Sequence, residues 1–325
     1  ENSPYLGRDG IMVERQYDDD ISLSHLTRAR GKYGVSLNLK SPEGRRVFMD
    51  MVAKADIVVE NFTAGTADRL GVGYEACAKV NPRIIFAALS GFGANDRSGK
   101  AMDVIIQALS GAMFTSGEPG HPPVRIGIPL VDTTTGMNAA IGVLLALYER
   151  EKSGKGQSIE VTLFDTALGM LHPHTSNALN GGQSARTGNG HPNIVPYDLY
   201  PTRTEKLFVA VGNDRQFAQL CQVLGKPELA TDALYRKNRD RVVNRDALRK
   251  ELVDLLSQFD GKELFHQLMG LGVPCAPMLS VEQALALDHT ATREMCAFIG
   301  KYRVTGIPVK LDRTPGSLRL PPPHV

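Results

Sequence analysis

The sequence of 325 residues contains no tryptophan and only four cysteines, Cys77, Cys221, Cys275 and Cys296. The cysteines lie far apart, and none belongs to a C-x-x-C pair. This spacing argues against the usual structural zinc sites and against a disulfide scaffold. Because their neighbours are largely apolar, we expect buried, reduced thiols, which fit a reducing compartment.

An excess of one charge and a long apolar run are also lacking. Lys and Arg total 37 and Asp and Glu total 35, so the net charge of +2 indicates no nucleic-acid partner. No run reaches the roughly 18 apolar residues of a membrane span, and the opening Glu1-Asn2-Ser3-Pro4 is not a signal peptide. We therefore expect no membrane partner and a cytoplasmic location, or the mitochondrial matrix for a eukaryotic source.

The glycine-rich signatures of nucleotide enzymes are missing as well. Gly71-Val72-Gly73 and Gly91-Phe92-Gly93 do not continue to a third glycine at the dinucleotide spacing, and no Walker-type loop occurs. The G-x-S-x-G element of α/β-hydrolases is absent too. The sequence thus gives no support to a nicotinamide enzyme, an ATP enzyme or an α/β-hydrolase.

The histidines do not have the spacing of metal ligands. His172 and His174 lie two residues apart and His191 comes later, whereas ligands on one helical face are three or four residues apart. No acidic partner accompanies them. We expect no metal site and interpret these histidines as solvated or core side chains.

Strand and helix patterns alternate through the first half of the chain. Such alternation is typical of a parallel, Rossmann-like sheet with covering helices, and therefore of an α/β fold. Ligands of these sheets bind where strands end, which is where Asn61-Phe62 and Gly91-Phe92-Gly93 lie. Strands are predicted at 34–39, 56–61, 83–90 and 158–163, and helices at 41–51, 66–70, 74–80, 104–113, from the Asp132 motif to about 151, and from 165.

The second half has a different texture. Residues 180–196 are rich in Gly, Asn and Pro and indicate a long loop at a domain boundary. A strand at 207–211 and helices near 214–224, 244–258 and 261–271 indicate a small α+β unit. We expect a large α/β domain over 1–185, a small α+β domain over 186–295, and an extended return segment over 296–325.

Asp132 is the lone acid in the run P-L-V-D-T-T-T-G-M-N at 129–138, between an apolar stretch that resembles a strand and an apolar helical stretch. We expect its carboxylate to be poorly solvated, which would make it a stronger nucleophile when ionised. The same local sequence also suits a helix N-cap. From these residues alone the two interpretations stay open.

Three basic residues, Lys40, Arg69 and Lys100, border predicted strand ends. Taken singly, such residues are most often solvated surface charges. Together, at the ligand-binding edge of a parallel sheet, they could hold phosphate groups.

An ordered set of motifs over nearly all of the chain resembles the class III CoA-transferases, the family of formyl-CoA:oxalate and carnitine CoA-transferases. The closest likeness in motif is to the members that resemble succinate–hydroxymethylglutarate CoA-transferase. The set comprises R-G-K at 30–32, L-N-L-K-S-P-E-G at 37–44, A-D-I-V-V-E-N-F at 55–62, R-L-G-V-G-Y-E at 69–75, N-P-R-I-I-F at 81–86, S-G-F-G at 90–93, G-E-P-G-H-P-P-V-R-I-G at 117–127, the Asp132 motif, and E-K-S-G-K-G-Q at 151–157.

This resemblance implies that Asp132 is the catalytic nucleophile and that Asp103 helps to orient it. It also implies coenzyme A contacts at Lys40, Asn61, Phe62 and Lys100, which Arg69 would join as a further phosphate ligand. Exchange through an aspartyl mixed anhydride and an enzyme-CoA thioester needs no metal and no tightly bound cofactor; acyl-CoA and a carboxylic acid are the substrates. Backbone amides of the glycine-rich surroundings are expected to bind the oxyanion. The family's fold implies an interlocked, ring-like homodimer.

The sequence departs from the family pattern in three places. The usual opening strand–helix unit and the tail beyond the proline run are missing, so we interpret the chain as a fragment. Met102 stands where many transferases have Tyr, and G-N-G-H-P-N-I-V-P-Y at 188–197 replaces the glycine loop of formyl-CoA transferases. The latter resembles relatives that act on succinate, glutarate or hydroxymethylglutarate, and it makes Asn189, His191 and Met102 candidate substrate contacts.

Two alternatives remain. An α-methylacyl-CoA racemase uses the same aspartate with a histidine as the second acid or base, but Ala101-Met102-Asp103 occupies that segment, and methionine exchanges no proton. A catalytically silent CoA-binding homologue is the other alternative, because fold does not ensure activity.

Overall fold

The computed structural model describes residues 5–6, 12–13, 22–95, 100–300 and 302–323. Its internal contacts divide the chain into two compact units. One unit combines residues 1–36 with 278–325, and the other spans residues 37–277. The sequence-based division into domains that end at residues 185 and 295 uses other boundaries than these two units, and it stays a prediction.

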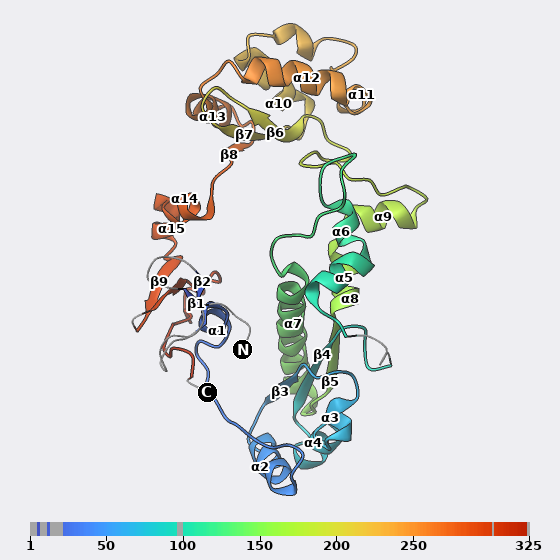
Figure 1. Cartoon of the computed structure of the whole chain (residues 1–325), viewed down its shortest axis with the longest axis vertical. Coiled ribbons are helices and arrows are strands. Elements are labelled where there is room, and N and C mark those ends of the chain that lie inside the picture. The colour runs from blue at the N-terminus through green and yellow to red at the C-terminus, as the bar shows by residue number, and fades with distance from the viewer. Residues whose placement is uncertain (1–4, 7–11, 14–21, 96–99, 301, 324–325) are drawn as a thin grey trace. The chain divides into compact units, whose positions relative to one another are not determined.

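A parallel three-stranded sheet organises the first part of the larger unit. Strands β3 (Ile57–Glu60), β4 (Ile85–Ser90) and β5 (Ser158–Thr162) lie in the order β3-β4-β5, and both pairings are parallel. The central strand β4 is fully buried in its first half, as its apolar sequence requires. The α/β class with a parallel sheet, predicted from the alternating patterns, is confirmed (Figure 1).

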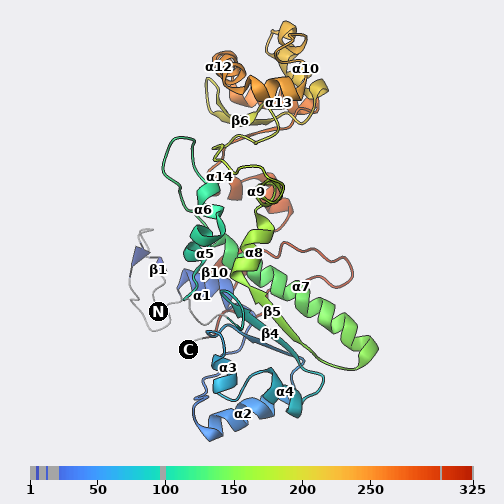
Figure 2. The ribbon, with the colours of Figure 1, turned by 90° about the vertical axis from the view of Figure 1, so that its right-hand side faces the viewer.

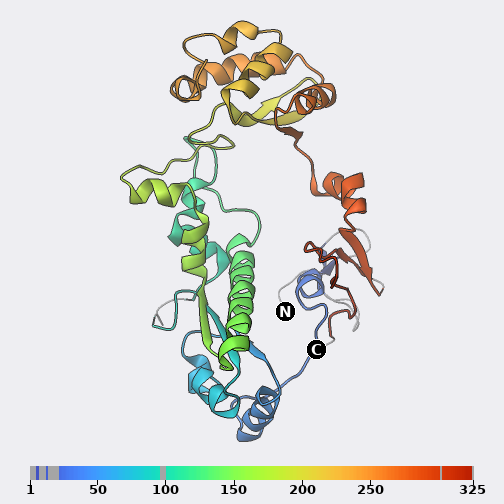
Figure 3. The same ribbon diagram turned by 180° about the vertical axis from the view of Figure 1, so that it is seen from behind.

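Helices connect and cover these strands. Ser41 caps the first of them by accepting a hydrogen bond from the Gly44 N–H group, and Pro42 stands at its first position, as the S-P-E-G motif predicts. The blue and cyan helices α2 and α4 pack together beside the sheet (Figure 3). The helices of this part are α2 (Pro42–Val52), α3 (Thr66–Arg69), α4 (Tyr74–Val80), α5 (Asp103–Ser110), α6 (Ala112–Thr115), α7 (Leu130–Ser153), α8 (Leu163–Met170) and α9 (His174–Leu179).

The strand predicted at residues 34–39 does not form. This segment has neither helix nor strand geometry, and most of its residues are exposed, Val35 among them. Alternating apolar residues form a strand only where a neighbouring strand accepts their backbone hydrogen bonds. None of the described strands pairs with this segment, so the alternation at 34–39 was misleading.

The helix α7 is the longest element described, with 24 residues. One side packs along β4 and β5 and against α8 (Figure 2). It ends at Gly154, whose φ of 75° is a left-handed conformation that glycine adopts without strain. Contrary to the expectation from apolar runs, α7 is long and apolar enough to cross a membrane by length and composition, although only 22% of its most apolar window is buried.

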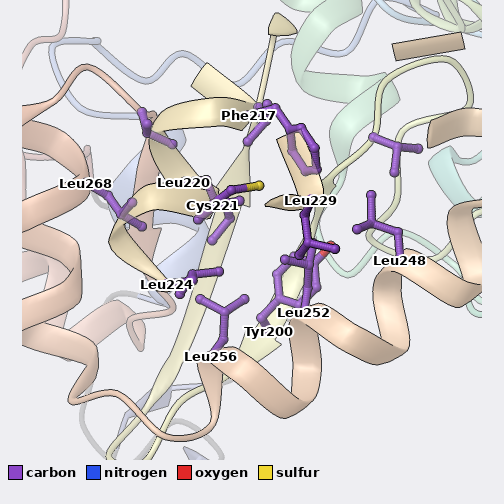
Figure 4. Packing of buried hydrophobic residues seen from close by; sticks show 14 of the residues in the cluster. Tyr200, Phe217, Leu220, Cys221, Leu224, Leu229, Leu248, Leu252, Leu256 and Leu268 are labelled. Atoms are coloured by element: carbon purple, nitrogen blue, oxygen red, sulfur yellow. The ribbon is translucent and has the colours of Figure 1, made fainter. Parts of the chain in front are cut away.

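A second sheet organises the rest of the larger unit. Strands β6 (Tyr197–Pro201), β7 (Lys206–Ala210) and β8 (Cys275–Pro277) pair antiparallel in that order. Helices α10 and α12 supply leucines to one core, in which Leu220, Leu252 and Leu256 are fully buried (Figure 4). We call residues 195–277 the small domain. Its helices are α10 (Asp214–Val223), the 3₁₀ turn at Pro227–Ala230, α11 (Asn238–Val243), α12 (Arg245–Leu256) and α13 (Gly261–Gly270).

The smaller unit is built from short elements. A β-hairpin of β9 (Cys296–Ile299) and β10 (Tyr302–Thr305) packs beside α1 (Leu23–Arg28). The strands β1 (Tyr5–Leu6) and β2 (Met12–Val13) pair antiparallel, and α14 (Val281–Leu285) contacts α15 (Asp288–Thr292). The described residues after Thr305 form no helix or strand, in agreement with the proline-rich sequence. All four cysteines are free; Cys77 and Cys221 are buried as expected, whereas Cys296 is exposed.

Candidate active site at the carboxyl edge of the parallel sheet

A cavity of about 420 Å³ lies where the strands of the parallel sheet end. Asn61 follows β3, Gly91 follows β4 and Leu163 follows β5, and all three line it. Asp103 and Asp132 enter from the first turns of α5 and α7. The carboxyl edge of a parallel sheet is the usual place for ligands, so this cavity is the first candidate for an active site.

A second cavity, of about 360 Å³, adjoins the first. The two share Asn61, Gly91 and Met102 among their lining residues, and so form one groove. Phe62 and Lys100 line the second part. The structure thus brings three of the predicted coenzyme A contacts, Asn61, Phe62 and Lys100, next to the predicted nucleophile.

The local sequence explains the narrow junction between the two cavities. A Cβ atom on Gly91 would lie 2.2 Å from the Cβ atom of Ala101, so only glycine permits this close approach. Next to Asn61, the Glu60 carboxylate accepts a hydrogen bond of 2.6 Å from the Phe62 N–H group and fixes the turn after β3. Burial raises the pKa of Glu60, and the hydrogen bond from Phe62 opposes that rise in part.

Asp132 is the third residue of α7, and Pro129 occupies the N-cap position. The N-cap interpretation of Asp132 is therefore wrong. The expectation of a poorly solvated carboxylate is also wrong for this chain, because Asp132 is exposed. Instead, the positive end of a 24-residue helix dipole favours its ionised form.

The carboxylate that caps α7 belongs to Asp103, 29 residues before Asp132. Its Oδ2 atom accepts hydrogen bonds from the Val131 N–H group at 2.8 Å and the Asp132 N–H group at 3.1 Å. Its Oδ1 atom accepts one from the Gln107 side chain. With these three donors, Asp103 fixes the backbone that carries Asp132, a geometry that suits an orienting residue.

Two residues of this site were missed by sequence reasoning. Gln107 is 1% exposed; its Nε2 atom donates to Asp103, and its Oε1 atom accepts a hydrogen bond of 2.8 Å from the Ile126 N–H group. Arg125, next to Ile126, lines the cavity of Asp132. The i,i+4 spacing of Asp103 and Gln107 on a predicted helix was a signal for the first. Arg125 lies in the quoted motif at 117–127, but nothing local marked it.

Arg125 is the one Arg or Lys among the described residues that line the Asp132 cavity. No ion pair of Arg125 occurs in the part of the chain that the structure describes. Two carboxylates, Asp103 and Asp132, line the same cavity. A guanidinium without a carboxylate partner can bind an anionic substrate there, where the two aspartates alone would repel it.

The backbone amides at the start of α7 are already occupied. The N–H groups of Leu130 and Thr133 donate to the carbonyl oxygens of Ile128 and Pro129, and those of Val131 and Asp132 donate to Asp103. These four groups are therefore not available to an oxyanion, contrary to the expectation for the segment around Asp132. The side chains of Arg125 and Asn61 remain as donors in the cavity.

Of the other predicted contacts, only Met102 lines this groove. Lys40 and Arg69 line neither cavity; the Arg69 guanidinium donates to the Thr66 hydroxyl at 3.0 Å. Met102 lines both cavities, whereas His191 lines a different one and Asn189 is exposed. The structure therefore does not bring the three predicted substrate contacts together.

Comparisons with known proteins bear on this site. The family model described as CoA-transferase family III matches residues 8–325. The acetyl-CoA:oxalate CoA-transferase of Acetobacter aceti is 41% identical over 300 residues, which are 91% of this chain and 77% of that protein. The succinyl-CoA:glutarate CoA-transferase of Mus musculus is 34% identical over 344 residues, 98% of this chain and 78% of that protein. A solved CAIB/BAIF family protein from Brucella suis has a TM-score of 0.81 and 33% identity, over 94% of this chain and 82% of that one.

Proposed function

We propose, from the premise that this chain belongs to CoA-transferase family III, that it transfers CoA from an acyl-CoA thioester to a short dicarboxylic acid with Asp132 as the covalent nucleophile. Membership of this family makes the chain an enzyme that acts on CoA thioesters. One observation carries the proposal. Asp132, held by Asp103 at the start of α7, lines a groove that continues to Phe62 and Lys100.

The first half of the reaction takes CoA from its donor. The Asp132 carboxylate attacks the thioester carbonyl carbon, the C–S bond breaks, and CoA leaves as a thiolate from a mixed anhydride. The thiolate then attacks the Asp132 carbonyl carbon. The donor acid leaves as a carboxylate, and CoA is bound to Asp132 as a thioester.

The second half repeats these steps in reverse order with another acid. The acceptor carboxylate attacks the Asp132 thioester and displaces the CoA thiolate, which gives a second mixed anhydride. Attack of the thiolate on the acceptor's acyl carbon forms the new acyl-CoA and restores the Asp132 carboxylate. Each step exchanges one carboxylate or thiolate for another, so no net proton or electron is required.

The side chains of the groove have separate roles in this proposal. Asp103 orients Asp132 through the helix backbone, because its oxygens already accept three hydrogen bonds. Arg125 stabilises the tetrahedral oxyanion and the incoming carboxylate, since it forms no ion pair with an acid among the described residues. Lys100 and Phe62 hold the CoA moiety in the adjoining part of the groove.

The dicarboxylate class rests on the relatives and on the loop at 188–197. The two relatives described above act, by their names, on oxalate and glutarate, and a relative from Haloarcula hispanica that is 32% identical over 299 residues is named for mesaconate. All three acids carry two carboxyl groups. The motif of the loop resembles that of relatives that act on succinate or glutarate.

The exposed face of α7 supports a homodimer. Ile141, Leu144, Leu145 and Tyr148 are all more than half exposed on this helix. Monomeric proteins rarely leave such a continuous apolar face open to water. We therefore propose that a second copy of the chain covers it.

Incubation with succinyl-CoA and a panel of acids tests this function. Oxalate, glutarate and mesaconate should yield new acyl-CoA esters, and mass spectrometry should find CoA attached to the peptide that contains Asp132. Epimerisation without a new ester would favour a racemase, and binding without either product would favour a silent homologue. A higher kcat/KM for acetate or carnitine than for all three dicarboxylates would contradict the substrate class.

A further inference from the structure

A cavity of about 370 Å³ lies within the larger unit, among residues 186–200, the start of α12 and the turn at 118–119. It shares no lining residue with the groove that contains Asp132. Three arginines, Arg186, Arg245 and Arg249, line it together with His191. This concentration of donors has no role in the chemistry of Asp132 described above.

Arg186 contributes a buried donor without an acceptor. Its Nη1 atom is inaccessible to water and has no hydrogen-bond partner in the described part of the protein. The guanidinium lies 5.5 Å from the centre of the Phe114 ring, which orients it without neutralising it. A buried N–H group of a charged side chain that lacks an acceptor is costly, so an oxygen ligand would be bound favourably.

Arg245 is fixed in place but keeps its charge. Its Nη2 and Nη1 atoms donate to the carbonyl oxygens of Pro192 at 2.7 Å and His191 at 3.4 Å, and its Nε atom donates to that of Val242 at 3.4 Å. A guanidinium has five N–H groups, so two remain for a ligand. None of the ion pairs among described residues includes Arg245.

His191 adds a neutral donor to the same wall. Its Nδ1 atom accepts a hydrogen bond of 3.0 Å from the Asn193 N–H group, which places the ring proton on Nε2. Burial and the charge of Arg245 lower the pKa of His191. The ring is therefore neutral at pH 7 and presents an N–H donor to a ligand.

The acidic residues of the cavity limit what it can hold. Asp198 is paired with Arg249 at 2.8 Å, and the Glu118 carboxylate lies against Gly188, where a Cβ atom would approach it within 2.3 Å. Asp246 lies in the first turn of α12, where the helix dipole stabilises it. Three acids balance three arginines, so the cavity has no excess positive charge to bind a phosphate-rich molecule such as CoA. A single carboxylate matches the planar guanidinium groups of Arg186 and Arg245.

We propose that this cavity binds a carboxylate group of a small organic acid through the guanidinium groups of Arg186 and Arg245, with the Nε2–H group of His191 as a third donor. The proposal rests on the proposed function in one respect, since the acid belongs to the class that the enzyme exchanges. The bound acid is either the exchanged substrate itself or a second molecule that is bound in addition to the exchanged one.

Binding can be measured without any turnover. In the Asp132→Ala protein, calorimetric titration with glutarate and succinate should detect binding. Adding Arg186→Gln or Arg245→Gln should weaken it by about tenfold or more, because each change removes a charge-assisted hydrogen bond. Arg186→Lys, which keeps the charge but loses the planar fork, should weaken it less than Arg186→Gln.

Arg239→Gln is the matched control. It removes one positive charge from the small domain at a side chain that is 83% exposed, pairs with Asp240 and does not line the cavity. Affinities unchanged by Arg186→Gln and Arg245→Gln, or weakened as much by Arg239→Gln, would overturn the proposal. Inorganic phosphate that binds as tightly as glutarate, and with the same dependence on Arg186, would overturn the carboxylate assignment.

Kinetics in the background that retains Asp132 separate the two sources of the acid. If the cavity holds the exchanged substrate, Arg186→Gln raises the KM for the acid about tenfold and leaves the KM for the acyl-CoA unchanged. If it holds a second molecule, the titration finds an additional equivalent of acid per chain, and the KM for the exchanged acid stays the same. Failure of the proposed function would instead be seen as the absence of acyl-CoA products and of any Asp132 adduct, whatever the titration shows.

Discussion

The small domain and the helix α7 differ in how far their apolar side chains are buried. Seventeen buried residues form one core in the small domain, and Leu248, Leu252 and Leu256 of α12 are fully buried there. The cluster at the start of α7 has only four buried members, and Leu144 and Leu145 further along the helix are each 65% exposed. The small domain therefore buries these leucines within its own core, whereas α7 leaves large apolar side chains exposed.

This difference separates stability from function. The closed core supports a rigid wall for the arginine-lined cavity. The nucleophile, by contrast, lies on a helix that leaves several large apolar side chains exposed. Its position depends on the hydrogen bonds that the Val131 and Asp132 N–H groups donate to the Asp103 carboxylate. Changes on α7 should therefore alter activity or assembly, and changes in the small-domain core should alter folding.

The largest effect is expected at the nucleophile. Asp132→Ala should lower kcat for CoA transfer by roughly 10⁴-fold or more, because no covalent intermediate can form. The midpoint of thermal unfolding should stay nearly the same, since the Asp132 side chain is exposed. Transfer assays and calorimetry measure both. Activity above a few per cent of the unmodified enzyme would contradict the proposed mechanism.

A matched pair of leucines probes the comparison directly. Leu252→Ala should lower the free energy of unfolding by about 2–5 kcal/mol, because it opens a cavity in a closed core. Leu144→Ala should change it by less than about 0.5 kcal/mol in the monomer. Urea titrations at several protein concentrations measure both, and sedimentation shows assembly. If Leu144→Ala lowers the free energy of unfolding only at concentrations where dimers form, the proposed dimer is supported. If Leu144→Ala and Leu252→Ala lower it equally at all concentrations, the contrast between α7 and the small domain is wrong.

Loss of the ion pair between Arg241 and Asp214 should lower the free energy of unfolding nearly as much as Leu252→Ala does. Arg241 is fully buried and donates to Asp214 at 3.1 Å. Asp214→Ala leaves that guanidinium without its carboxylate and should cost about 3 kcal/mol of unfolding free energy. Asp254→Ala, on the exposed side of α12, is the control and should cost little.

The same pair predicts a dependence on pH. Burial raises the pKa of Asp214, but hydrogen bonds and charges from Lys237 and Arg241 outweigh it, so the pKa is lower in the folded protein. The stabilisation is therefore complete above the unfolded value of about 3.9 and is lost as the pH falls through the folded value. The difference in stability between Asp214→Ala and the unmodified protein should shrink below pH 4. A difference that persists unchanged at pH 2 would exclude this explanation.

Binding of CoA should depend on the open groove rather than on the core. Lys100→Ala should raise the KM for the acyl-CoA by roughly 10- to 100-fold, because a charge-assisted phosphate contact is lost. The resemblance predicts the same for Lys40→Ala, although Lys40 lines neither cavity. Lys79→Ala on α4 is an exposed control. An unchanged KM in both variants would return the two lysines to the class of solvated surface charges.

The smallest effect is expected at Gln107. Gln107→Leu removes the hydrogen bonds that join Asp103 to the Ile126 backbone, so kcat should fall roughly tenfold while the KM for the acyl-CoA stays constant. Gln222→Leu, on the surface of α10, is the control. A rise in KM without a fall in kcat would mean that Gln107 shapes the groove rather than positioning the nucleophile.

Local patterns predicted much of this molecule. The apolar strands β3, β4 and β5, the capped helix α2 and the helices α10, α12 and α13 of the small domain follow from periodicity and from turn residues within a few positions. The family follows from the order of motifs along the chain. These features depend on residues that are near one another in the sequence, and their signals can be read there.

Tertiary structure alone decided how the site is assembled. The sequence determined that an aspartate follows Val131, but only packing placed Asp103 against the first amides of α7 and left Asp132 exposed. The strand predicted at 34–39 was wrong for the same reason, because a strand requires a neighbouring strand that the local pattern does not specify. Arg125 and the buried donor of Arg186 were likewise invisible in the sequence. Periodicity reports which face of an element is apolar, whereas a hydrogen bond between residues 28 or 29 positions apart depends on how distant elements meet in space.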